Sequence, residues 1–116
     1  MDSRINMEIS HHSVGNIKVL ALEGDLNAAN SREVETRLNQ MIMGGNKKLV
    51  VNLDKLNYIS SAGLRVFLSA NKLMKKKEGK LVLCGLNNTV KEVFEISGFH
   101  MIFAIFSTEE EALSDF

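Results

Sequence analysis

Residues 47–74 read KKLVVNLDKLNYISSAGLRVFLSANKLM, and two different hydrophobic patterns meet within this stretch. Residues 49–53 (LVVNL) form a short apolar run rich in β-branched side chains, which is typical of a strand covered on both faces. From Leu64 to Met74, apolar residues recur at helical spacing. The stretch therefore predicts a buried strand, a short polar turn and a helix.

The predicted turn, residues 58–63, contains two adjacent serines, Ser60 and Ser61. A serine at the start of a helix commonly serves as a cap, because its oxygen accepts a hydrogen bond from a free backbone amide. The same amides and the positive end of the helix dipole also favour an anion, including a phosphate on the serine itself. Both interpretations remain open. A hydrolase nucleophile elbow is excluded, because Ile59 stands where that motif needs glycine.

The rest of the chain alternates between strand and helix patterns. We predict strands at residues 5–9, 17–22, 80–84 and within 100–106, with a hairpin turn at Gly15-Asn16 and residues 23–27 leaving the sheet. Helices are predicted after a capping box formed by Asn30 and Glu33, after a cap at Asn88, and from Ser107, with Gly44-Gly45 and Gly98 as stop signals. The order β-β-α-β-α-β-α-β-α implies parallel crossovers after the hairpin. The fold class is thus α/β, a mixed and mostly parallel sheet with about four helices.

Length and composition favour one ordinary globular domain over residues 1–116. Apolar residues make up 45% and charged residues 24% of the chain, as in typical soluble domains. Fourteen basic residues balance fourteen acidic ones, so charge gives no reason to expect nucleic acid as a partner. The single cysteine, Cys84, lies in an apolar run and is predicted to be a buried thiol. Because no apolar run approaches the ~20 residues of a membrane span, we expect a cytoplasmic protein.

The sequence contains no pattern that predicts catalysis or a cofactor. His11, His12 and His100 lack cysteine or acidic residues at metal-ligand spacing, so we expect no metal site. No glycine-rich phosphate fingerprint follows a strand, and no histidine or second serine is placed to form a catalytic triad. We therefore expect no enzymatic activity and no cofactor.

The helix after the serines has a second apolar stripe, formed by Val66, Ala70 and Leu73. A single sheet need not cover both stripes of such a helix. The second stripe is either part of the core or an exposed docking surface beside Ser61.

Across essentially its whole length, the chain resembles the STAS domains of bacterial anti-sigma factor antagonists. The resemblance is carried by Gly24-Asp25-Leu26-Asn27, by Leu49-Val50-Val51-Asn52 and above all by Tyr58-Ile59-Ser60-Ser61-Ala62-Gly63-Leu64. In that family the turn typically reads Asp-Ser-Ser/Thr-Gly-Leu, and its first serine is phosphorylated by a partner that is both anti-sigma factor and serine kinase. Alignment on Gly63-Leu64 places Ser61 at the phosphoacceptor position.

The resemblance implies a switch. The unphosphorylated protein would bind the anti-sigma factor and so release sigma factor; phosphorylation of Ser61 would break that complex, and a phosphatase would restore it. The residues expected to bind the partner are Asn27, Ser60, Ser61, Ala62, Gly63, Leu64 and Val66.

Three positions depart from the family pattern, because Asn27, Asn52 and Ser60 stand where the family often has aspartate. We interpret them as one neutral pole around Ser61, which would attract a basic kinase surface less strongly. The alternative function is therefore a STAS module without phosphorylation, which docks in a regulatory or transport complex or senses a small ligand.

Overall fold

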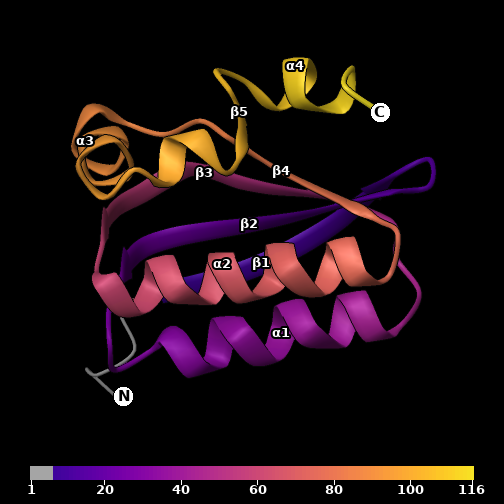
Figure 1. Cartoon of the computed structure of the whole chain (residues 1–116), viewed down its shortest axis with the longest axis horizontal. Coiled ribbons are helices and arrows are strands. Elements are labelled where there is room, and N and C mark those ends of the chain that lie inside the picture. Colours follow the sequence, from indigo (N-terminus) through magenta and orange to yellow (C-terminus); the bar gives the residue numbers. More distant parts are fainter. Residues whose placement is uncertain (1–6) are drawn as a thin grey trace.

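The computed structural model describes residues 7–116, and in this range strands and helices follow one another in the predicted order (Figure 1). The elements are β1 (Met7–Val14), β2 (Ile17–Leu26), α1 (Ser31–Met43), β3 (Lys48–Ile59), α2 (Ser61–Lys76), β4 (Lys80–Cys84), α3 (Asn88–Ser97), a 3₁₀ helix (Phe99–Met101), β5 (Ala104–Phe106) and α4 (Glu109–Leu113). The predicted fold class is confirmed. Of the first predicted strand, Ile5 lies outside the described residues.

The five strands form one sheet in the order β1-β2-β3-β4-β5. The β1 and β2 strands are antiparallel and join through the predicted turn, since Val14 pairs with Ile17 across Gly15-Asn16. All later pairings are parallel, as the intervening helices require.

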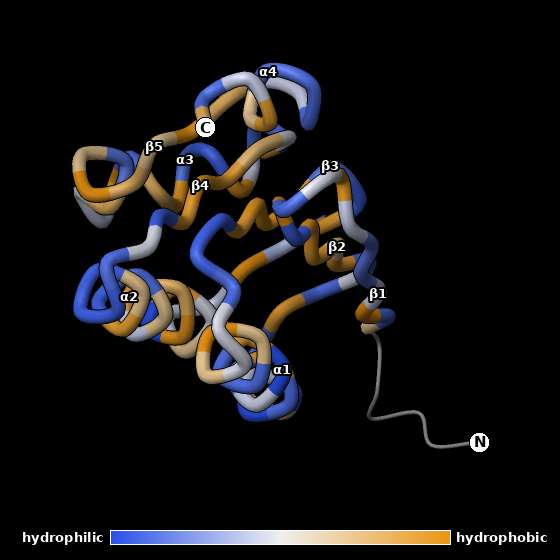
Figure 2. The backbone as a smooth tube through the Cα atoms, turned by 90° about the vertical axis from the view of Figure 1, so that its right-hand side faces the viewer, coloured by the Kyte–Doolittle hydropathy of each residue, from blue (hydrophilic) through white to orange (hydrophobic). Residues whose placement is uncertain are grey.

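The helices are shared unequally between the two faces of the sheet. Helices α1, α2 and α3 contribute to one large hydrophobic cluster, whereas α4 covers a smaller cluster on the opposite face. In Figure 2 the apolar strands lie between α1 and α2 on one side and α4 on the other. Leu49 and Val51 belong to the large cluster and Val50 to the small one. The prediction of a strand covered on both faces is confirmed.

The second apolar stripe of α2 belongs to the core. Val66 is 6% exposed and Ala70 2%, and Leu73 packs against the same cluster. Helix α1 lies beside α2 (Figure 1) and covers this stripe. The interpretation of the stripe as a docking surface is therefore wrong, and Val66, which was expected to bind the partner, belongs to the core.

Residues 23–26 remain in the sheet, contrary to the prediction. Strand β2 pairs with β3 up to Leu26 opposite Ile59, through register shifts on either side of Gly24. Gly24 has a φ of 116°, which glycine adopts at little cost, so the irregular pairing continues past the predicted end of the strand. The predicted turn at residues 58–63 consequently shrinks to Ser60 alone.

Two predicted helix caps are also corrected. The Asn30 side chain does not cap α1, so the predicted capping box with Glu33 is wrong. Its Oδ1 accepts from the Asn27 amide at 2.9 Å, and its Nδ2 donates to the Asp25 carbonyl at 2.8 Å, which ties α1 to the end of β2. Asn87, one residue before the predicted cap, accepts from the Val90 amide and caps α3.

In the part of the chain that the structure describes, no helix has the length and apolarity needed to span a membrane.

Candidate functional site

The structure assigns different tasks to the two neighbouring serines. Ser60 has an extended backbone and caps α2, with 3.3 Å between its Oγ and the Gly63 amide nitrogen. Its own amide donates to the carbonyl of Leu26 at 2.9 Å. Ser60 thus anchors the start of α2 to the end of β2, which is the structural role that the sequence allowed for either serine.

Ser61 is the first residue of α2, and its side chain is exposed. Within residues 7–116 its hydroxyl makes no hydrogen bond. The first backbone hydrogen bond of the helix joins the Leu64 amide to the Ser60 carbonyl at 3.0 Å, so the amides of Ser61 and Ala62 precede the helical ladder. An accessible hydroxyl at the positive end of a sixteen-residue helix suits a group that acquires negative charge.

Gly63 lets α2 approach the sheet closely enough to present Ser61 in this way. A Cβ atom at Gly63 would lie 2.7 Å from Cγ of Leu26 and 2.9 Å from Cγ1 of Ile59. Both of these side chains are buried, so they have little room to move. The glycine of the motif is required by packing against the strand ends.

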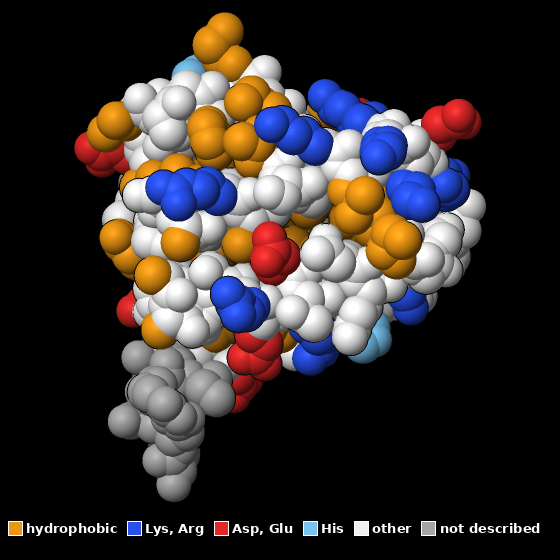
Figure 3. Space-filling view, turned by 60° about the horizontal axis from the view of Figure 1, so that its bottom comes forward, with side chains coloured by type: hydrophobic (Ala, Val, Ile, Leu, Met, Phe, Trp, Pro, Cys, Tyr) orange, Lys and Arg blue, Asp and Glu red, His pale blue; other side chains and the backbone are white. Residues whose placement is uncertain are grey.

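An apolar groove runs from Ser61 to α3. It is lined by Tyr58, Ile59, Ser60, Ser61, Leu64, Arg65, Val93, Ile96, Ser97 and Phe99. Figure 3 shows hydrophobic side chains gathered at the left of this face, the end at which α3 and the start of α2 lie in Figure 1. Ile96 is 79% exposed. A contiguous exposed apolar surface of this kind is typical of a protein interaction site.

The sequence did not identify the α3 side of this groove. Its residues Val93, Ile96 and Phe99 are far from Ser61 in the chain and meet it only through the fold. A signal was present: Ile96 falls outside the buried face that Val90 and Phe94 define on α3. A large apolar residue on the solvent-facing side of a helix could have indicated this interaction surface.

The structure brings Asn27 to the site but places Asn52 elsewhere. Asn27 follows Leu26, which pairs with Ile59, and so it lies at the strand end beside Ser60. Its Oδ1 accepts from the amides of Ala29 and Asn30, and it thus shapes the entry into α1. The interpretation of Asn52 as part of one neutral pole is wrong, because seven residues of strand, about 23 Å, separate it from Ile59.

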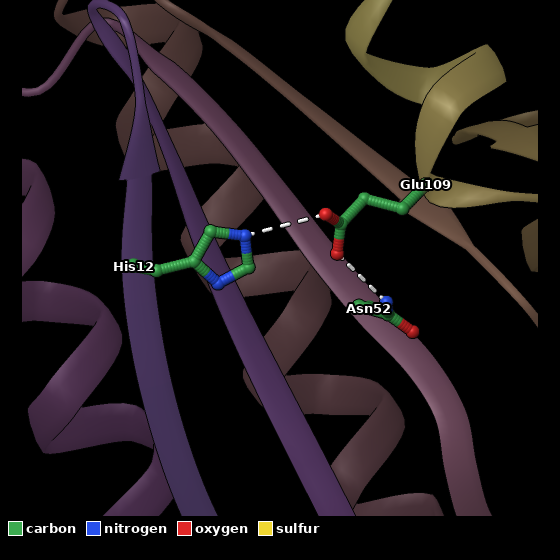
Figure 4. A network of polar contacts seen from close by, with 3 residues as sticks. All are labelled: His12, Asn52 and Glu109. Atoms are coloured by element: carbon green, nitrogen blue, oxygen red, sulfur yellow. Dashed lines mark hydrogen bonds and ion pairs between the residues drawn. The ribbon is translucent and has the colours of Figure 1, made fainter.

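Asn52 belongs to a polar contact on the opposite face of the sheet. Figure 4 shows His12 of β1 and Asn52 of β3 directed at Glu109, the first residue of α4. The Asn52 amide donates to Glu109 at 2.9 Å, and His12 Nε2 lies 3.3 Å from the other carboxylate oxygen. These contacts hold α4 against the smaller hydrophobic cluster.

Cys84 lies beneath α4 in that cluster. Its side chain is fully buried, which confirms the prediction of a buried thiol. Burial, assisted by the nearby carboxylates of Glu109 and Asp54, raises the pKa of this thiol to about 12. The thiol is therefore protonated at neutral pH and is a poor nucleophile.

This fold and the Ser60-Ser61 turn are those of a STAS domain, and the STAS domain family model matches residues 5–112. The chain belongs to this family. It is 39% identical to a protein of Bordetella bronchiseptica, provisionally designated anti-sigma factor antagonist BtrV, over 95% of each chain.

Two solved structures share the fold at lower identity. An anti-sigma factor antagonist of Mycobacterium paratuberculosis superposes with a TM-score of 0.89 at 14% identity, over 98% of this chain and 96% of that one. The anti-sigma factor antagonist SpoIIAA, in its unphosphorylated form, superposes with a TM-score of 0.81 at 23% identity, over 93% of this chain and 95% of that one. SpoIIAA of Bacillus has also been solved in a phosphorylated form.

Proposed function

We propose that this protein is an anti-sigma factor antagonist whose binding is switched off by phosphorylation of Ser61. The unphosphorylated chain binds an anti-sigma factor that is also a serine kinase, and so releases sigma factor. A phosphatase removes the phosphate and restores binding. The protein acts by binding and performs no catalysis of its own.

The observation that carries this proposal is that the two serines have different roles. Ser60 makes the capping hydrogen bond, so the Ser61 hydroxyl is free of any structural task within residues 7–116 and points to solvent. A kinase can modify it without disturbing the helix. The dipole of α2 tolerates the roughly two added negative charges, so the fold survives phosphorylation.

The groove explains why phosphorylation would disrupt a complex. Ser61 lies at the edge of a mostly apolar surface that includes Leu64, Ile96 and Phe99. A partner that buries this surface also removes water from Ser61. A phosphate there would then lose its contacts with water on binding, which is costly for a charged group. Among the proposed partner-binding residues, Ser60, Ser61 and Leu64 line this groove. The others, Asn27, Ala62, Gly63 and Val66, are not part of its lining.

A binding assay with phosphomimetic variants tests the proposal. We expect Ser61→Asp to abolish binding to the cognate anti-sigma factor in titration calorimetry. Ser69→Asp places the same charge on another exposed serine of α2 and serves as the matched control, which should bind like the parent chain. If Ser61→Asp binds as tightly as Ser69→Asp, the switch is refuted.

The apolar groove also supports a second candidate function, a docking module that works without phosphorylation. The exposed side chain of Ile96 can anchor a partner whatever the state of Ser61. In that case Ser61→Asp retains most of the binding, and Ile96→Asp removes it. Since Ile96→Asp weakens binding under either function, the loss or retention of binding in Ser61→Asp separates the two functions.

A further inference from the structure

Arg65 is the one charged residue that lines the apolar groove, as far as residues 7–116 define it. It lies on α2 four residues after Ser61, and both side chains are exposed. The motif that carries the family resemblance ends at Leu64, one residue before Arg65.

Residues four apart on a helix lie on the same face, about 6 Å apart along the axis. A helical side chain also leans towards the N-terminus and covers the preceding turn. The spacing therefore places Arg65 on the same side of α2 as Ser61, and both residues line the groove. An anion followed by a cation at this spacing is the favourable orientation for an ion pair on a helix.

We infer that Arg65 is the residue that holds the phosphate of phosphorylated Ser61. This inference rests on the proposed function, which supplies the modification, and it adds a role for a residue of this chain. The planar guanidinium can donate two parallel hydrogen bonds to phosphate oxygens. The amides of Ser61 and Ala62 lie at the same end of the helix and add their positive potential.

The pairing has a consequence for the groove. Without phosphate, Arg65 contributes the one positive charge that the described residues give to the groove lining. With phosphate, that charge is neutralised and the groove edge carries about one net negative charge. Phosphorylation would thus add an anion and neutralise Arg65, so the net charge that the groove edge presents to a partner changes from positive to negative.

The full chain with phosphoserine placed at position 61 during synthesis allows a direct test. The second pKa of the phosphate is measured by ³¹P NMR titration in the parent chain and in Arg65→Gln. We expect the phosphate pKa to be about half a unit lower in the parent chain than in Arg65→Gln, as for an exposed ion pair. Arg65→Lys should retain part of the difference.

Lys72→Gln is the matched control, because Lys72 is an exposed cation of the same helix. It lies eleven residues from Ser61, about 16 Å along the axis, and its charge is screened at that distance. We expect its phosphate pKa to equal that of the parent. Equal pKa values in the parent chain and Arg65→Gln, or equal shifts in both glutamine variants, would overturn the pairing.

This test is independent of any kinase or partner, so the two ideas can fail separately. If the pKa difference is present but the phosphorylated chain still binds its partner, the pairing stands and the proposed function fails. If the difference is absent while phosphorylation releases the partner, the switch stands and Arg65 has no part in holding the phosphate.

Discussion

Replacing each of the two serines by alanine should separate structure from signalling. Ser60→Ala removes the oxygen that caps α2, whereas Ser61→Ala removes a hydroxyl without a hydrogen-bond partner in residues 7–116. Loss of a serine cap typically costs about 1 kcal/mol. The Oγ–N distance of 3.3 Å is slightly longer than the usual range for such a bond, so we expect about 0.5–1 kcal/mol here.

This free energy can be converted into a melting temperature. A chain of 116 residues gains about 0.24 kcal/mol/K of entropy on unfolding, so Ser60→Ala should lower Tm by about 2–4 °C. Ser61→Ala should change Tm by less than about 1 °C. Calorimetric unfolding of both variants and the parent chain measures this. A decrease in Tm for Ser61→Ala equal to or larger than that for Ser60→Ala would refute the assignment of the capping role to Ser60 alone.

Three further predictions concern other parts of the account. Gly63→Ala should destabilise the fold by about 1 kcal/mol net, since overpacking against Leu26 and Ile59 outweighs the better helix propensity of alanine; an unchanged urea midpoint would contradict this. Ile96→Asp should weaken partner binding at least about tenfold with little change in stability, while Met43→Asp, also at an exposed apolar position, should bind normally. Burial raises the pKa of the Cys84 thiol from 9.0 to about 12, so above pH 9 the folded state retains a proton that the unfolded state loses. The contribution of this thiol to the free energy of unfolding is therefore fully present below pH 9 and declines above it. Cys84→Ala should flatten that decline in denaturant titrations at pH 8 and pH 10.

Most of the architecture was predictable because each element carries its own periodic signal. The run at residues 49–53 indicated a strand covered on both faces, and the alternation of strand and helix required parallel connections. The ends of the strands and helices were harder to predict from the sequence. Strand β2 continues past Gly24 because β3 provides a partner for Asp25 and Leu26, and no local pattern reports the presence of a partner strand.

The site was predictable only in part, for a similar reason. The two serines and Gly63 are adjacent in the sequence, so their motif could be identified directly. The groove required α3 to pack on β3 near the start of α2, so that Ile96 and Ser61 line the same surface. Asn52 was misplaced because position along a strand decides which end of the sheet a residue reaches, and seven residues separate it from the end of β3.

The most direct test of the central claim is an intact-mass measurement after incubation with ATP and the candidate anti-sigma kinases of the source organism. Peptide mapping then locates the phosphate, and size-exclusion chromatography reports the complex. We predict a single phosphate on Ser61, none in Ser61→Ala, and loss of the complex on phosphorylation. A stable complex with a kinase that leaves Ser61 unmodified, or that persists after Ser61 is modified, would contradict the account.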